Sequence, residues 1–115
     1  EYEDLADKKS DYNSSVMRER VQKARDIQLK RYQGLGFYTN SEIPSSMIDT
    51  FCVLGQEENT LMKNAYESLG LSARAHNRIL KVARTIADLD NSERITAAHL
   101  AEAIGYRSLD KKYWN

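Results

Sequence analysis

The sequence predicts an all-α fold, a small bundle of four to five helices, because apolar residues recur at helical spacing between cap and stop residues. Of its 115 residues, 41% are hydrophobic and 30% charged, which suits one globular domain with one core. The strongest periodic signal lies between Ser72 and Leu89. Its apolar stripe consists of Ala75, Ile79, Val82, Ala83, Ile86 and Leu89. We expect this helix at the centre of the fold, with Ala75, Ile79, Val82 and Ile86 buried.

A long helix is predicted before it, from the serines at 14 and 15, which suit an N-cap, to a stop at Gly34. Its expected inner face carries Met17, Val21, Ala24, Gln28 and Tyr32. A buried amide needs partners, so we expect Gln28 to make a structural hydrogen bond. Residues 1–13 are acidic with little apolar periodicity, and we interpret them as a linker, with the domain itself spanning residues 14–115.

In the middle of the chain the sequence predicts a loop over residues 34–44 and a short helix from Ser45 to Cys52. A third helix is predicted from Gln56 to Leu69, with Gly70 as the stop residue just past its end. The inner face of this third helix should contain Leu61, Met62, Ala65 and Leu69. Ile95 could add a short extended pairing, and Thr96 should cap a last helix carrying Leu100, Ala103 and Ile104. Beyond this helix we expect a frayed tail.

Charge is balanced overall but not along the chain. Lys plus Arg and Asp plus Glu both number 17, so no net field attracts nucleic acid or a membrane. The predicted first helix nevertheless carries six basic residues against two acidic ones, while residues 40–70 carry five acids against Lys63 alone. We therefore expect the first helix to lie near the acidic third one or to contact another domain, without binding DNA strongly.

The sequence lacks the motifs of an autonomous enzyme. It contains no GxxxxGK[ST], GxGxxG, HExxH or CxxC pattern, so we expect no catalytic residue in this chain alone. His76 and His99 are the only histidines and fit packing or surface roles better than a metal site. The single Cys52 reads as a small buried residue and suits a reducing cytoplasm. A start without Met in an acidic stretch suggests a piece of a longer protein.

Arg74 stands apart among the basic residues because it lies in the first turn of the strongest helix, directly after the Ser72 cap. The polar arc of that helix also gathers Arg78, Lys81 and Asp88. A guanidinium on a rigid mount with an open face can bind phosphate. From periodicity alone, a solvated face or an ion pair with the third helix is favoured over that role.

The stretch LSARAHNRILKVARTIADLDNSERITAAHLAEAIGYRSLDKKYW resembles the C-terminal domain of magnesium chelatase subunit I-like AAA+ ATPases, in particular their bacterial competence-associated helicase branch. RERVQKARDIQLKRY resembles the first helix of the same domain. Together the resemblance covers nearly all of residues 14–114. It implies a helical lid that packs beside a nucleotide-binding core.

The resemblance also implies roles for particular residues. Arg74, matching the Ser-x-Arg at the start of the lid helix, would be the second-sensor arginine that reaches the nucleotide phosphates, with Arg78, Arg18 and Arg20 in supporting phosphate or interface contacts. The parent protein would hydrolyse ATP with Mg²⁺, while this fragment alone would bind no cofactor or metal. Its partners would be an upstream AAA+ core in cis and neighbouring subunits of a homo-oligomeric ring. The full-length protein could also bind DNA, and no membrane partner is expected. The alternative hypotheses are a free-standing nucleic-acid-binding module using arginines of the first helix, and a protein-interaction bundle.

Overall fold

The computed structural model describes the backbone of residues 2–109 and the side chains of residues 13–107. Five α-helices lie in this part of the chain, together with two short 3₁₀ helices, η1 (Asn40–Glu42) and η2 (Ser45–Met47). The α-helices are α1 (Tyr2–Arg31), α2 (Ile48–Phe51), α3 (Gln56–Leu69), α4 (Ala73–Leu89) and α5 (Ala97–Leu109). Because no strand occurs between residues 2 and 109, the predicted all-α fold is confirmed. The expected frayed tail lies outside the described residues.

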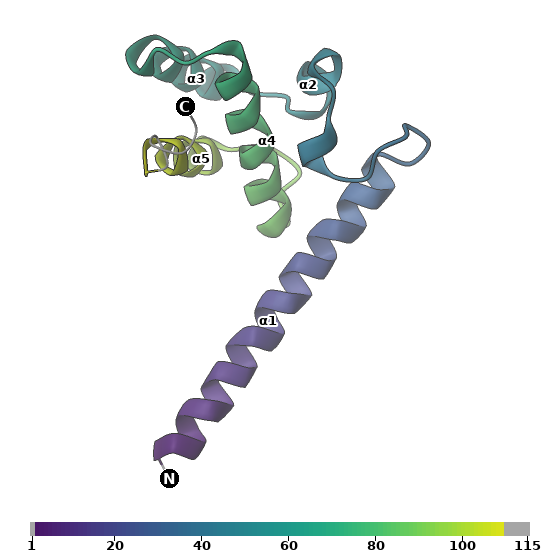
Figure 1. Cartoon of the computed structure of the whole chain (residues 1–115), viewed down its shortest axis with the longest axis vertical. Coiled ribbons are helices and arrows are strands. Elements are labelled where there is room, and N and C mark those ends of the chain that lie inside the picture. Colours follow the sequence, from purple (N-terminus) through teal and green to yellow (C-terminus); the bar gives the residue numbers. More distant parts are fainter. Residues whose placement is uncertain (1, 110–115) are drawn as a thin grey trace.

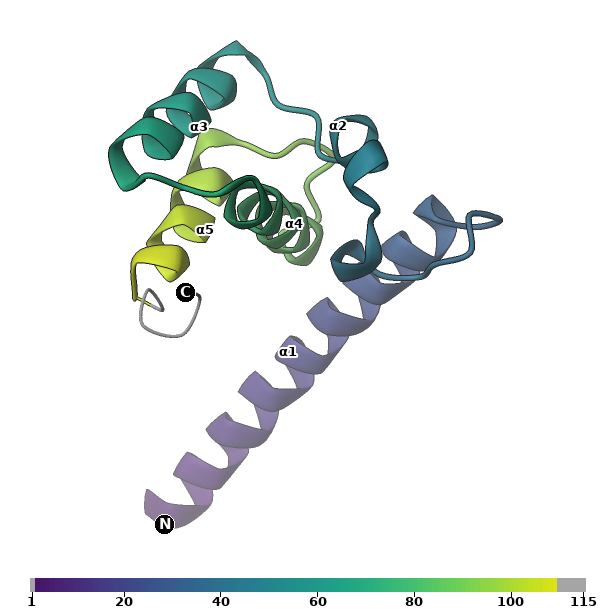
Figure 2. The same ribbon diagram turned by 45° about the horizontal axis from the view of Figure 1, so that its top comes forward.

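Helix α4 is the centre of the arrangement, as the sequence predicts. Helices α3 and α5 lie on one side of it, while α1 and α2 lie on the other (Figure 1). The closest packing joins α4 to α5, to α1 and to η1, and α3 to α5. Figure 2 shows that α1 runs diagonally past the end of α4 and extends beyond the rest of the domain. The acidic α3 is therefore on the far side of α4 from the basic α1. The first of the two expected placements of α1, near the third helix, is wrong, and a contact with another domain stays a prediction.

Helix α1 is longer than predicted. It runs without interruption from Tyr2, so the predicted start at the serine pair is wrong. Its end is close to the prediction, since Gly34 and Gly36 adopt positive φ angles of 83° and 88° in the turn that follows. A positive φ strains residues with a Cβ, which explains the glycines there. The interpretation of residues 1–13 as a linker stays a prediction.

The inner face of α1 is buried only where α4 and η1 cover it. Ala24, Gln28 and Tyr32 are buried at four-residue spacing, whereas Met17, predicted on the same face, is 54% exposed. The Gln28 side-chain oxygen accepts a hydrogen bond from the Asn40 backbone N–H at 3.0 Å. The predicted structural role of this amide is confirmed.

Helix α4 begins at the predicted cap, where the Ser72 hydroxyl accepts a hydrogen bond from the Ala75 backbone N–H at 3.1 Å. Its buried face is shifted from the predicted stripe. Two predicted core members, Ile79 and Ala83, are fully buried, but the other core residues are Leu80, Arg84, Ala87 and Asp88. Ala75, Val82, Ile86 and Leu89 are only half-buried. The shift arises because α1 and η1 cover the side of α4 that carries Asp88, which the sequence placed on the polar arc.

The remaining elements match the predicted order with local corrections. The short helix near residues 45–52 appears as η2 and α2, and α3 has the predicted bounds, with Gly70 in the left-handed conformation at φ 62°. Leu69 is 41% exposed and not in the core. The pairing expected at Ile95 does not occur in the described structure, where that side chain is buried between α4 and α5. The Thr96 hydroxyl accepts a hydrogen bond from the His99 N–H at 3.3 Å, so its capping role is confirmed.

Two substitutions on α4 should distinguish the observed core from the predicted one. Ile79 is fully buried, so Ile79→Ala should lower the free energy of unfolding by about 2–5 kcal/mol. Ile86 is half-buried, so Ile86→Ala should cost clearly less. Urea unfolding followed by circular dichroism measures both. An equal loss in the two variants would contradict the observed orientation of α4.

Candidate functional site

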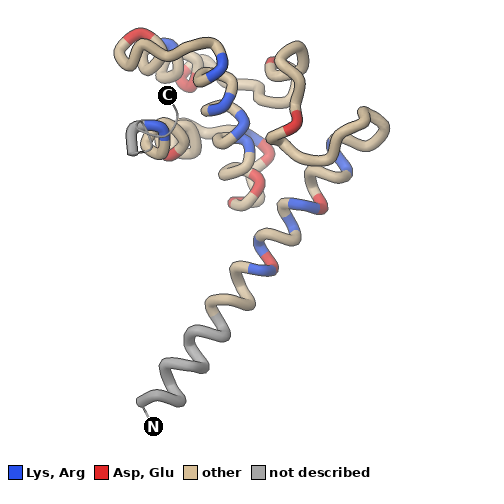
Figure 3. Tube along the Cα trace, in the orientation of Figure 1, with Lys and Arg blue, Asp and Glu red and all other residues tan. Residues whose placement is uncertain are grey.

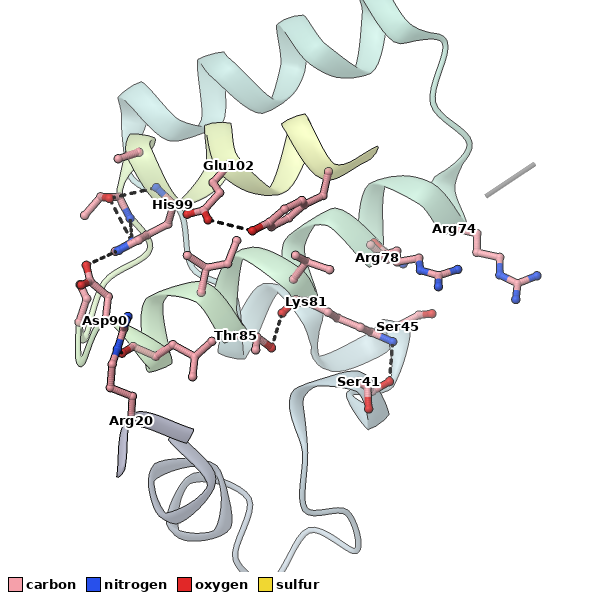
Figure 4. Close-up of a pocket in the computed structure, with 18 of the residues that line it drawn as sticks. Arg20, Ser41, Ser45, Arg74, Arg78, Lys81, Thr85, Asp90, His99 and Glu102 are labelled. Carbon is pink, nitrogen blue, oxygen red and sulfur yellow. Dashed lines mark hydrogen bonds and ion pairs between the residues drawn. The ribbon is translucent and has the colours of Figure 1, made fainter. Parts of the chain in front are cut away.

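An open groove with a volume of about 1270 Å³ follows the half-buried side of α4 (Figure 4). Helix α5 borders it on one side, and the residues around Ser41 and Ser45 border it on the other. Val82, Ile86 and Leu89 supply its apolar surface. These are three of the four members of the predicted core stripe that the domain leaves half-buried; the fourth, Ala75, does not line the groove.

The end of the groove near the start of α4 is basic. Arg74, Arg78 and Lys81 follow one another at helical spacing along its rim, and Figure 4 shows Arg74 and Arg78 projecting to the same side. The ammonium of Lys81 donates to the Ser41 backbone carbonyl at 3.3 Å. Arg74 is exposed, and no hydrogen bond or ion pair joins it to any side chain within residues 13–107. This end is therefore open to an external anion.

The opposite end of the groove is a fixed polar cluster around His99. The His99 ring is buried, and its Nδ1 accepts a hydrogen bond from the Thr96 backbone N–H at 3.0 Å. An Nδ1 that accepts leaves Nε2 to donate to the Asp90 carboxylate, 2.9 Å away. Nearby, the Arg20 Nε of α1 donates to the Leu89 carbonyl at 3.2 Å. These groups form hydrogen bonds within the domain and stabilise the connection between α4 and α5.

The chemistry that the basic end of the groove offers is anion binding, because Arg74, Arg78 and Lys81 lie there. Guanidinium and ammonium groups suit phosphate or carboxylate partners. Within the described residues there is no group of three or more His, Cys, Asp or Glu side chains placed to hold a metal ion. No helix of the described part is long and apolar enough to cross a membrane.

Residues 11–107 match the family described as magnesium chelatase, subunit ChlI C-terminal. The chain belongs to this family. The match covers most of α1 and of the α4–α5 unit, so the resemblance noted in the sequence to the magnesium chelatase C-terminal domain is confirmed.

Relatives of this chelatase-type domain are found in longer bacterial proteins. The chain is 44% identical over 96 residues to Competence protein ComM of Haemophilus influenzae, a match that covers 84% of this chain and 18% of that protein. It is 43% identical over 99 residues to the uncharacterized protein YifB of Escherichia coli, a match that covers 86% of this chain and 19% of that protein. A YifB protein of Salmonella typhimurium is 36% identical over the same length. The chain thus spans less than a fifth of the length of these relatives.

The chelatase-type domain brings together some of the predicted site residues and separates others. Arg74, Arg78 and Arg20 all line the groove, although Arg20 lies at the end opposite to Arg74. Arg18 is exposed on α1 and does not line it. His76 also lies outside this groove, and its ring packs against that of Tyr66 at 5.7 Å between centroids. Of the predicted site residues, Arg74 and Arg78 lie together at the basic end of the groove, with Lys81 beside them.

Sequence reasoning missed a buried polar network at the junction of α1, η1 and α4. We call it the Asp88 clasp and define it as Arg31, Asn40, Arg84 and Asp88. The Asp88 carboxylate accepts two hydrogen bonds from the Arg31 guanidinium, at 2.7 and 2.9 Å, and one from the Asn40 side-chain amide at 2.9 Å. Arg84 Nη2 lies 3.1 Å from the same carboxylate. The hydrogen bonds that Arg31 donates to Asp88 raise the pKa of Arg31 above its usual value, so the guanidinium stays charged.

Arg84 extends the clasp to the connection between α4 and α5. Its guanidinium donates to the backbone carbonyls of Ser92 at 2.8 Å and Glu93 at 3.0 Å. The available sequence signal was the four-residue spacing of Arg84 and Asp88, which suits an ion pair on a helix. Arg84 directly follows Ala83 and Asp88 directly follows Ala87, so the burial of this pair could have been suspected.

Cys52 should behave as an inert core residue. It is 3% exposed, and burial raises the pKa of its thiol to about 11. At pH 8 only about one thiol in a thousand is then ionised, and the thiolate is the reactive species. We expect no reaction with a thiol reagent within minutes in the native state and full reaction in denaturant. A free surface cysteine, introduced as Arg18→Cys, is the control that should react at once, and equally fast labelling of native Cys52 would contradict its burial.

Proposed function

We propose that this domain is the lid of a magnesium chelatase-like AAA+ ATPase, and that Arg74 is its second-sensor arginine. The observation that carries the proposal is the exposure of Arg74, without a carboxylate partner among the described side chains, at the basic end of the groove. A partner of opposite charge is expected from outside the domain. In a lid, that partner is the phosphate chain of a nucleotide held by the core.

The local structure suits this role. Arg74 lies in the first turn of a 17-residue helix whose start is fixed by the Ser72 cap. A cation held by a rigid helix stabilises phosphate charge without reorganising during the reaction. Arg78 and Lys81 add positive charge at the same end, so the residues present fit a polyphosphate. ATP, bound with Mg²⁺, supplies the bond that is hydrolysed, and the groups that act directly on it belong to the core.

The apolar part of the groove supports a protein partner beside the nucleotide. Val82, Ile86 and Leu89 are half-buried residues of the central helix that the isolated domain does not cover completely. We propose that the ATPase core of the same polypeptide packs there. Neighbouring subunits of a cytoplasmic ring would then sense the movement of this lid as the nucleotide changes.

The decisive substitution is Arg74→Ala. In this chain it should change the free energy of unfolding by no more than about 0.5 kcal/mol, because it removes an exposed side chain outside the core. In the full-length ATPase it should lower kcat about a hundredfold, the usual loss for a charge-stabilising donor. Thermal unfolding and steady-state ATP hydrolysis measure the two effects.

The matched control is Arg25→Ala, which removes an exposed arginine from α1 and should leave hydrolysis unchanged. Unaltered ATP turnover in folded Arg74→Ala protein would reject the second-sensor role. Unfolding of this chain by the same substitution would instead make Arg74 a structural residue.

A nucleic-acid-binding role is the second candidate, because basic residues run along both α1 and α4 (Figure 3). The outer side of α1, however, carries both basic and acidic side chains, and Lys23 forms an ion pair with Glu19 at 3.7 Å. We therefore expect this chain to bind a DNA duplex more weakly than 1 micromolar at about 0.15 M salt, a level typical of non-specific contacts. Fluorescence anisotropy measures the affinity. Submicromolar binding that weakens with salt and is lost in Arg18→Ala/Arg25→Ala would favour nucleic acid as the partner.

A further inference from the structure

Two arginines of α1 converge on the last turn of α4. Arg31 forms a two-pronged contact with the Asp88 carboxylate, and Arg20 donates to the carbonyl of the next residue, Leu89. The two arginines are separated by 11 residues, or about 16 Å along a helix that rises 1.5 Å per residue. The attachments are separated along α1 and adjacent on α4, so together they hold this stretch of α1 against the last turn of α4.

The contact at Asp88 is the stronger of these attachments. The side chain of Asp88 is only 1% exposed and that of Arg31 19%. Charge-assisted, two-pronged hydrogen bonds in such a site are stronger and more directional than exposed ones. Asn40 ties η1 to the same carboxylate and also receives the Tyr32 hydroxyl, so the turn after α1 is held in the same unit.

Asp88 and Arg74 lie at opposite ends of α4. Fourteen residues separate them, which corresponds to about 21 Å of continuous helix. A helix of this length that packs against α1, α5 and η1 moves as one body. Any change in the angle between α1 and α4 at the Asp88 end would therefore displace Arg74 at the other end. A tilt of about 10° over that length moves the end by nearly 4 Å, more than a hydrogen bond tolerates.

We propose that Asp88 is a positioning residue for Arg74, because it locks α4 to α1 and so fixes where the sensor arginine is presented to the nucleotide. This inference rests on the proposed function of Arg74. Asp88 itself is buried within the domain and does not contact the ligand. Its effect on hydrolysis passes through Arg74 alone.

A double-mutant cycle in the full-length ATPase tests this coupling. Asp88→Asn keeps the size of the side chain but removes the charge that binds Arg31. It should lower kcat about tenfold in the wild-type background and have no further effect in the Arg74→Ala background, since coupled residues are not additive. Arg31→Gln, which breaks the clasp from the α1 side, should behave in the same way.

A rescue variant and a control complete the cycle. Arg31→Lys keeps the positive charge and should recover part of the rate. Asp26→Asn makes the same chemical change as Asp88→Asn on the outer side of α1 and is the matched control.

A distance measurement on this 115-residue chain tests the lock itself. Spin labels at Arg18→Cys on α1 and Ala101→Cys on α5, in a Cys52→Ala background, report the angle of α1 by electron paramagnetic resonance. The distance distribution should be narrow with the clasp intact and about twice as wide in Asp88→Asn and Arg31→Gln, while circular dichroism shows unchanged helix content.

The outcomes separate the two proposals. Losses from Asp88→Asn and Arg74→Ala that multiply, or an equally narrow distribution in both clasp variants, would overturn the positioning role while leaving the sensor role intact. Unchanged hydrolysis in Arg74→Ala alone would overturn the sensor role and, with it, the positioning of that residue.

Discussion

The Asp88 carboxylate is held away from water between two guanidiniums and an amide, and the arrangement of the helices depends on this contact. Burying a charge is costly unless its partners are all in place, and removing one partner of such a pair typically costs about 3–5 kcal/mol. Those partners come from α1, η1 and α4, and Arg84 continues to the carbonyls after α4. Three segments therefore meet at Asp88, and a fourth, the connection after α4, is tied to them through Arg84. Apolar packing gives the domain its core, while the clasp selects one angle between α1 and that core.

The position of the clasp also explains how α1 can extend past the domain. Side chains from Asn13 to Arg20 are all exposed, so this stretch gains no burial within the chain. Helix growth from an existing end is far easier than a new start, and Ala24, Gln28 and Tyr32 provide that fixed end. A helix anchored at one end is a stiff extension of the domain. The exposed part of α1 is consequently placed by the Arg20 contact with Leu89 and by the buried contacts farther along the same helix.

The sequence predicted the helical fold, the bounds of α3, the Ser72 cap and the central place of α4, because these follow from local spacing and cap chemistry. It could not predict which side of α4 is buried most deeply. Leu80 and Ile86 are both apolar, and only tertiary packing decides that the first is buried, near Cys52 and Met62, while the second borders a groove. Asp88 was placed on the outer arc for the same reason, since a buried acid is revealed only by the distant Arg31 and Asn40. The start of α1 was missed because the two serines expected to cap it lie inside a helix that continues toward Tyr2.

Several acids of the domain already have partners within it, and Arg74 at the basic end of the groove has no carboxylate partner among the described side chains. Asp88 is bound by Arg31 and Arg84, buried Glu58 lies beside Arg94, and Asp90 accepts from His99. Across the groove, Glu102 accepts from the Tyr106 hydroxyl at 3.1 Å. Carboxylates engaged in this way are held apart from Arg74, although the chain as a whole carries no net charge. The ion pairs that hold α4 in place therefore leave Arg74 exposed in the first turn of this rigid helix. It is available to an anion that the domain itself does not contain.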